Sequence, residues 1–250
     1  YYLVCYQPDE DTFDPKTRIF KGDLKNANGK TVFIKLIATD NSGATAYDDK
    51  IEFSYNSKTG VVIDGYIQGA TIFFDANKNG VKDADEPFAT TDANGEYELD
   101  IPDSFDTNKN GSFDPEEGNL VAFGGTDTAT GLPLETPVSA PIDATVVTLL
   151  TTLVTDLMAG GMTQTEAESK VKSSLSIPAG VDLLDLDPIA STAKNEPGGV
   201  ETLVAMTKVQ NIIIQTTSLI DGASTADNTA ITKAVVEAIN NKIKSGGSLD

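Results

Sequence analysis

Two stretches of the chain carry the same oxygen-bearing residues at the same spacing. The first runs from Asp75 to Glu86 and the second from Asp106 to Glu117, each twelve residues long. Both have Asp at position 1, Asn at positions 3 and 5, Gly at position 6 and Glu at position 12. This spacing is that of the twelve-residue calcium-binding loop. The sequence therefore predicts at least two calcium ions, one for each loop.

The spacing follows from what calcium requires of its ligands. Calcium binds about six to eight oxygen atoms, and glycine at position 6 allows the sharp turn that brings them together. Position 7 supplies its backbone carbonyl, and the glutamate at position 12 supplies both carboxylate oxygens. Magnesium should substitute poorly, because it requires tight octahedral geometry. The predicted ligands are the carbonyls of Val81 and Ser112 and the side chains of Asp75, Asn77, Asn79, Asp83, Glu86, Asp106, Asn108, Asn110, Asp114 and Glu117.

The distribution of charge also favours bound cations. The chain has 38 Asp and Glu residues against 18 Lys and Arg, a formal net charge of −20. Residues 61–143 hold 17 of the acidic residues but only three basic ones, Lys78, Lys82 and Lys109. Three lysines cannot neutralise such a local excess, which therefore indicates metal ions. The same charge opposes binding to nucleic acid, and no apolar run approaches the length of a membrane-spanning helix.

The residue types that are missing exclude most catalytic chemistry. The chain contains no His, no Trp and one Cys. Catalysis that depends on His is excluded, and so are His-ligated zinc sites. Cys5 has no partner for an internal disulfide, and we expect it to be a small core residue. Hydrolysis of glycosides by paired carboxylates needs no His, but the carboxylates cluster in the calcium loops and no Trp can stack on sugars. We therefore expect a non-catalytic protein.

The elements that must position the loops differ along the chain. In the first region, 31–38 and 44–55 are rich in β-branched and aromatic residues and flank a turn-forming run, which predicts a hairpin. Another turn and strand are expected at 13–20. In the middle region, 71–74 predicts a strand before the first loop, and 90–99 predicts a turn followed by a strand. The calcium loops thus lie on a β-scaffold, which favours a structural role over a switch.

The last region changes to helical periodicity. Helices are predicted at 144–159, from the Thr163–Glu166 capping box to about Leu175, at 200–220 and at 229–244. The last of these carries a continuous apolar stripe every fourth residue, at Ile231, Val235, Ile239 and Ile243. Four helices with short connections predict a small helical bundle.

Two stretches resemble modules of bacterial surface proteins. The first resembles the C-terminal half of bacterial cadherin-like modules, through Phe13, Asp14, Thr17, Phe20, Gly22 and 38–46. The second resembles the prealbumin-like B-type modules of staphylococcal serine–aspartate repeat proteins, through residues 64–75, the first calcium loop, Glu86-Pro87 and residues 91–97. Such modules act as stalk or spacer units in adhesins, and the resemblance implies that calcium stiffens them.

These observations predict a multidomain chain of all-β sandwich modules followed by a small all-α domain. The expected boundaries are 1–57 for an N-terminally truncated cadherin-like module, 60–143 for the prealbumin-like module and 144–250 for the helices. The chain begins at Tyr1 rather than Met, and we expect it to be part of a longer, secreted or cell-surface bacterial adhesin or matrix protein. Its expected partners are neighbouring modules and a surface, glycan or protein ligand.

Two alternatives stay open at this point. One is an accessory region of a secreted polysaccharide-degrading enzyme, and the other is a cellulosomal docking-type module, which also carries paired calcium loops. Two further acidic clusters are weaker candidates for ion sites and are expected to be solvated turns. They comprise Asp9, Glu10, Asp11 and Asp14 in the first region and Asp182, Asp185 and Asp187 in the last.

Overall fold

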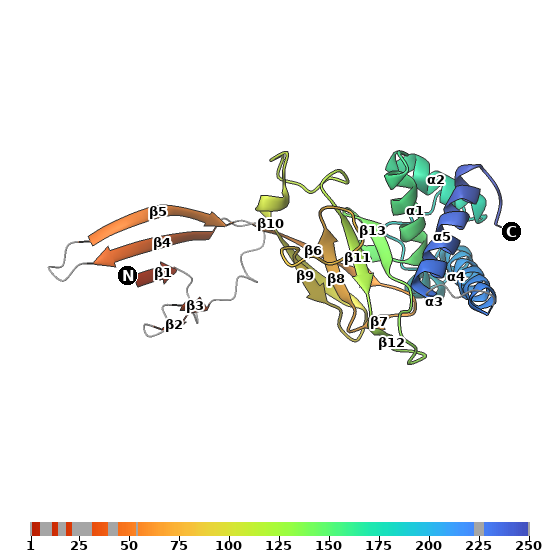
Figure 1. Ribbon diagram of the computed structural model, residues 1–250, viewed down its shortest axis with the longest axis horizontal. Coiled ribbons are helices and arrows are strands. Elements are labelled where there is room, and N and C mark those ends of the chain that lie inside the picture. The colour runs from red at the N-terminus through yellow and green to blue at the C-terminus, as the bar shows by residue number, and fades with distance from the viewer. Residues whose placement is uncertain are drawn as a thin grey trace. The chain divides into compact units, whose positions relative to one another are not determined.

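The computed structural model describes strands within residues 2–53, and then residues 55–222 and 228–249 (Figure 1). Side chains are described from residue 56 onward, except at 223–229 and 250. The chain divides into two compact units. The first comprises residues 1–58 and 100–112, and the second comprises residues 59–99 and 113–250. Sheets precede a C-terminal helical region, as the sequence predicts.

The strands of the first unit pair locally. Three of them form an antiparallel sheet in the order β1-β4-β5, and β2 and β3 form a separate antiparallel pair. The predicted hairpin of 31–38 with 44–55 is confirmed, because Val32 pairs with Phe53 and Thr39 pairs with Thr45. The bounds are β1 (Tyr2–Cys5), β2 (Thr12–Asp14), β3 (Ile19–Lys21), β4 (Val32–Thr39), β5 (Thr45–Phe53) and the short 3₁₀ helix η2 (Asp103–Phe105).

The remaining strands form three small sheets. A four-stranded sheet has the order β13-β11-β8-β9, a three-stranded sheet has the order β10-β6-β14, and β12 pairs with β7. Their bounds are β6 (Tyr55–Val62), β7 (Ile67–Gln68), β8 (Thr71–Asp75), β9 (Phe88–Thr90), β10 (Glu96–Pro102), β11 (Asn119–Phe123), β12 (Thr126–Asp127), β13 (Val138–Pro141) and β14 (Val146–Val147).

The burial patterns of β8 and β10 show how these two strands face the core. In β8, Ile72, Phe73 and Phe74 are all fully buried, as expected for the inner strand of a sheet covered on both faces. In β10, buried and exposed residues alternate, so that Tyr97 and Leu99 face the core while their neighbours face solvent. The strands predicted at 71–74 and within 90–99 are therefore confirmed.

The helices are α1 (Leu149–Ala159), α2 (Gln164–Ser174), α3 (Pro188–Ala193), α4 (Gly199–Asp221) and α5 (Asn228–Lys244). The predicted apolar stripe of α5 is confirmed, since its four aliphatic residues are all buried.

The helix start predicted at Ala144 is wrong. Val146 and Val147 instead form β14, parallel to β6, and Thr148 caps α1 by accepting hydrogen bonds from the amides of Leu150 and Thr151. The short α3 was not predicted.

In the second unit the helices gather beside the sheets (Figure 1). The α1 residue Thr151 donates from Oγ1 to the carbonyl of Ser139 in β13 at 2.7 Å, and the Ser139 amide donates to Thr152 Oγ1 at 2.8 Å. The amide of Thr145 donates to the carbonyl of Leu184 at 2.8 Å. The boundary predicted at residue 143 therefore falls inside the second unit. In the described part of the chain, no helix is long and apolar enough to span a membrane.

Candidate metal centre

A strand leads into the first loop, as the sequence predicts, and a strand follows each loop. The first loop begins at Asp75, the last residue of β8, and ends two residues before β9. The second follows η2 and leads into β11. Residues of the second loop up to Ser112 belong to the first unit, and those from Phe113 onward belong to the second.

The opening half of the first loop wraps around the side chain of Asp75. Its Oδ1 accepts from the Asn79 amide at 3.1 Å, and its Oδ2 accepts from the Gly80 amide at 2.8 Å. Asn77 Oδ1 accepts from the same Asn79 amide at 3.0 Å, and Asn79 Oδ1 accepts from the Val81 amide at 2.6 Å. Gly80 has φ of 75°, which a glycine adopts without strain. The side-chain oxygens of positions 1, 3 and 5 are therefore gathered along one turn.

The closing half is held by Glu86. Its Oε1 accepts from the Ala76 amide at 3.0 Å and its Oε2 from the Asp83 amide at 3.0 Å, so the last residue of the loop reaches back to the first turn. Asp83 Oδ2 accepts from the side-chain amides of Asn77 at 2.7 Å and Asn79 at 3.0 Å. Positions 1, 3, 5, 9 and 12 are thus linked by hydrogen bonds in the first loop.

The turn hydrogen bonds of the first loop recur within each half of the second loop. Asp106 accepts from the amides of Asn110 at 3.2 Å and Gly111 at 2.8 Å, while Asn110 Oδ1 accepts from the Ser112 amide at 2.8 Å. Asn108 Oδ1 accepts from the Asn110 amide at 2.9 Å. In the closing half, Glu117 Oε2 accepts from the Asp114 amide at 3.1 Å. The two loops therefore share their local backbone structure as well as their spacing.

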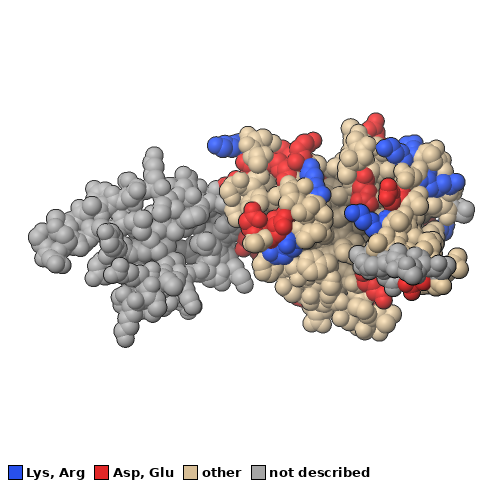
Figure 2. Space-filling view, in the orientation of Figure 1, with Lys and Arg blue, Asp and Glu red and all other residues tan. Residues whose placement is uncertain are grey.

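The first and last carboxylates of the loops are buried. Asp75 is 1% exposed and Glu86 is 4% exposed, and Asp106 and Glu117 are each 8% exposed. Buried carboxylates are normally paired with a cation or bound to a metal. Within the described residues, neither Asp75 nor Glu86 forms an ion pair with Lys or Arg. Figure 2 shows that acidic side chains also gather in several groups on the described surface facing the viewer.

The donors suit a hard cation of flexible coordination. In the described part of the chain, no three Asp, Glu or Cys side chains converge into a metal-binding group. Each loop instead combines three carboxylates with two amide oxygens and one backbone carbonyl, and the carbonyl-bearing Val81 is exposed. This is the mixed, all-oxygen set that calcium accepts, so the residues present fit the ion.

The three aspartates of the weaker cluster in the last region, Asp182, Asp185 and Asp187, accept hydrogen bonds from different donors. Asp182 Oδ1 accepts from the Leu184 amide at 2.9 Å, and Asp185 Oδ1 accepts from Thr145 Oγ1 at 2.5 Å. Asp187 caps α3 and accepts from the Tyr66 hydroxyl at 2.9 Å. Burial, followed by this hydrogen bond, raises the pKa of Tyr66 to about 12. These three aspartates therefore stabilise the fold in different places.

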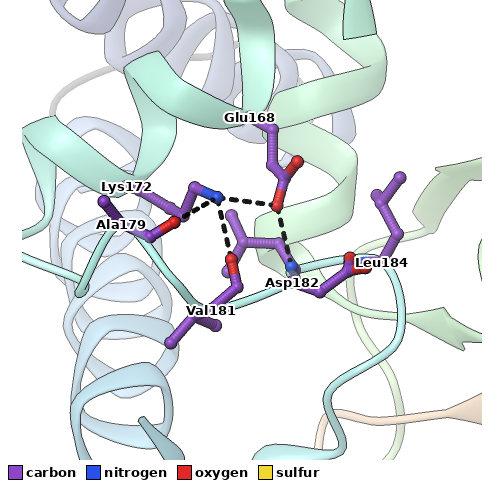
Figure 3. Close-up of polar contacts among 7 residues, drawn as sticks. Glu168, Lys172, Ala179, Val181, Asp182 and Leu184 are labelled. Atoms are coloured by element: carbon purple, nitrogen blue, oxygen red, sulfur yellow. Dashed lines mark hydrogen bonds and ion pairs between the residues drawn. The ribbon is translucent and has the colours of Figure 1, made fainter. Parts of the chain in front are cut away.

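The segment that carries these aspartates is fastened to α2 (Figure 3). Lys172 Nζ donates to the carbonyls of Ala179 at 3.1 Å and Val181 at 2.8 Å, and pairs with Glu168 at 3.0 Å. Glu168 in turn accepts from the Leu183 amide at 3.0 Å. In the other weak cluster, Asp9, Glu10 and Asp11 lie outside the described residues, as does the side chain of Asp14.

One acidic pair was not found from the sequence. Asp64 and Asp127 are far apart in the chain, but the Asp127 carboxylate lies against Gly65. Burial and the charge of Asp127 raise the pKa of Asp64, and a hydrogen bond from Gln210 lowers it in part. Asp127 is itself buried, and it accepts from the Ala129 amide at 2.9 Å. No local sequence motif predicts this pair, because Asp64 and Asp127 come together only in the folded chain.

Comparisons with protein-family models, with curated proteins and with solved structures found no match to this chain.

Proposed function

We propose that this chain is a non-catalytic, calcium-binding part of a bacterial surface adhesin or matrix protein, in which calcium rigidifies the β-module. The observation that carries the calcium proposal is the repeated loop structure, with buried carboxylates at positions 1 and 12 of both loops. In each loop, the residues at positions 1, 3, 5, 9 and 12 and the carbonyl of position 7 would hold the ion. Calcium would supply the positive charge that the buried carboxylates need.

The proposed role is structural because strands, not helices, follow the loops. Phe88–Thr90 and Asn119–Phe123 are both paired in the four-stranded sheet, so no helix pair is present there to reorient when calcium binds. Calcium loops with few charged ligands in extracellular modules bind in the range of about 10⁻⁴ to 10⁻³ M, and sensor loops bind more tightly. We propose dissociation constants from micromolar to millimolar, so that the calcium present outside a cell would occupy both loops.

The surface-protein assignment rests on the two resemblances and on composition. The cadherin-like and prealbumin-like sandwich modules stay proposals, and the order of sheets before helices supports them in general terms. The strand after each loop weighs against a cellulosomal docking module, which has a helix there. An accessory region of a polysaccharide-degrading enzyme is the remaining alternative, and the release of reducing ends from polysaccharide by the purified chain would favour it.

Calorimetric titration of chelator-treated protein tests the calcium proposal. Two calcium-specific binding events are expected, and magnesium at equal concentration should give weak heat or none. Calcium should also raise the melting temperature, since an ion that binds only the folded state adds about 2.7 kcal/mol at 100 times its dissociation constant.

Matched variants assign the sites. Glu86→Gln and Glu117→Gln should each remove one binding event, because position 12 supplies two ligand oxygens. Asp85→Asn and Glu116→Gln change the exposed neighbours by the same loss of charge, and they should keep both events. If the wild-type chain shows no calcium-specific heat, the proposed function is wrong. If the position-12 variants keep both events, the ligand assignment is wrong.

A further inference from the structure

The start of the first loop and the end of the second lie side by side in one sheet. Strand β8 enters the first loop at Asp75, and β11 leaves the second loop two residues after Glu117. These strands pair antiparallel, with Asp75 opposite Asn119. All of these residues belong to the second unit. The start of one loop and the end of the other are therefore connected through two directly paired strands.

Buried side chains strengthen this connection. Phe74, which precedes the first ligand of the first loop, lies 5.5 Å between ring centroids from Phe113, at position 8 of the second loop. Phe74 is fully buried and Phe113 is 6% exposed. Gly118 directly follows the last ligand of the second loop, and a Cβ there would lie 2.4 Å from the Phe74 ring. The closing half of the second loop is thus packed on the residue from which the first loop starts.

A lysine links the two loops outside the core. Lys78 stands at position 4 of the first loop, and its Nζ donates to the carbonyl of Pro115, at position 10 of the second loop, at 2.6 Å. Lys78 itself is exposed, with φ of 58°, in the left-handed region. Lys78 lies between Asn77 and Asn79, within the turn whose Asn79 amide donates to Asp75 and Asn77, so its backbone is part of the structure that the first loop forms.

We infer that the two loops bind calcium as a coupled pair, with Lys78 as the positioning residue that carries part of the coupling. This inference rests on the proposed function, since it assumes that both loops bind the ion. Calcium in the first loop orders its backbone together with Phe74 and Lys78. The closing half of the second loop then needs less ordering to bind its own ion, so its affinity rises. Linkage requires the effect to be reciprocal and equal in both directions.

Calorimetric titration of the full chain with calcium measures the coupling. In Glu86→Gln, the affinity of the second loop should fall about fivefold or more relative to the wild type, within the usual range of coupling between sites. In Glu117→Gln, the affinity of the first loop should fall by the same factor. If the wild-type titration equals the sum of the two single-site titrations, the coupling is wrong while the calcium proposal stands. If the wild type gives no calcium-specific heat, the calcium proposal itself fails.

Lys78→Met tests the positioning role, and Lys109→Met is its matched control. Lys109 occupies position 4 of the second loop with the same φ of 58°. Its replacement removes the same charge and leaves the hydrogen bond from Lys78 to Pro115 intact. We expect Lys78→Met to reduce the coupling factor at least twofold and Lys109→Met to preserve it. Equal coupling factors in the two variants would overturn the role of Lys78, because a general effect of charge would change both alike.

Discussion

At the scale of single residues, Asp64 is placed where its charge costs stability. Its Oδ1 is buried without a hydrogen-bond partner among the described residues, and the carboxylate of Asp127 lies nearby. Burial first, and this neighbouring charge second, raise the pKa of Asp64 above its ordinary value of 3.8, although Gln210 opposes the shift. Between the ordinary and the raised pKa, the folded chain holds a proton that the unfolded chain has lost. Stability from this group therefore rises as the pH falls from neutral through the raised pKa.

The prediction is that Asp64→Asn increases the free energy of unfolding at pH 7 and weakens the gain on acidification. Asparagine keeps the size of the side chain and accepts hydrogen bonds without carrying the buried charge. Urea unfolding at pH 7 and at pH 4, in chelator so that calcium does not contribute, measures both effects. Glu135→Gln removes an exposed charge as the control. An Asp64→Asn variant less stable than the wild type at pH 7 would contradict the argument.

The turns that open both loops could be predicted from sequence because the hydrogen bonds that form them are local, whereas calcium binding itself stays a prediction. The turns that bind Asp75 to Gly80, and Asp106 to Gly111, join residues only five positions apart. Side chains of Asp and Asn form such turns wherever the spacing allows. The pair of Asp64 and Asp127 could not be predicted, because strand pairing and helix packing bring it together.

At the scale of elements, α2 begins as its sequence requires. Thr163 accepts from the Glu166 amide at 3.3 Å, and the Thr163 amide donates back to Glu166 Oε2 at 3.1 Å. This backbone hydrogen bond is the main cause of the lowered pKa of Glu166. The helix then buries Ala167 and Val171. The cap therefore marks where α2 begins, and the buried residues follow within the helix.

We predict that Thr163→Ala lowers the free energy of unfolding by about 1 kcal/mol, the usual cost of losing an N-cap side chain. Thr165→Ala is the matched control, because Thr165 is exposed two residues later inside the first turn. It should be neutral or slightly stabilising, since alanine favours the helix. Thermal or urea unfolding compares the two. An equal loss in both variants would show that the hydroxyl of Thr163 does not stabilise the helix.

The sequence predicts the bounds of a helix or strand well where local residues mark both of its ends. It predicts them less well where pairing with a distant strand sets the bounds. The start predicted for α1 is too early because its first residues continue the apolar pattern of the helix, and periodicity alone does not separate a short buried strand from a helix. Pairing of Val146 with Val61 made that strand, and Thr148 then began the helix. The short α3 did carry a signal, since Asp187 followed by Pro188 is a good helix start.

At the scale of the whole molecule, the sequence shows a change of periodicity near residue 143, whereas the contacts place sheets and helices in one unit. Composition and periodicity describe which elements form. They do not describe which elements share a core, because that depends on strands such as β14 pairing with a strand far away in the chain. The domain boundary expected between residues 60–143 and 144–250 stays a prediction of the sequence, and it can be tested without cutting the chain.

The last prediction is that a helix substitution and calcium act on the same unfolding transition. Leu150 in α1 is 2% exposed, so Leu150→Ala should lower the free energy of unfolding by about 2–5 kcal/mol. If sheets and helices unfold together, calorimetry should show this variant lowering the temperature of the transition that calcium raises. Ala129→Gly at an exposed turn is the control and should leave that temperature nearly unchanged. Two separate transitions, one shifted by calcium and the other by Leu150→Ala, would instead establish a domain boundary near residue 143.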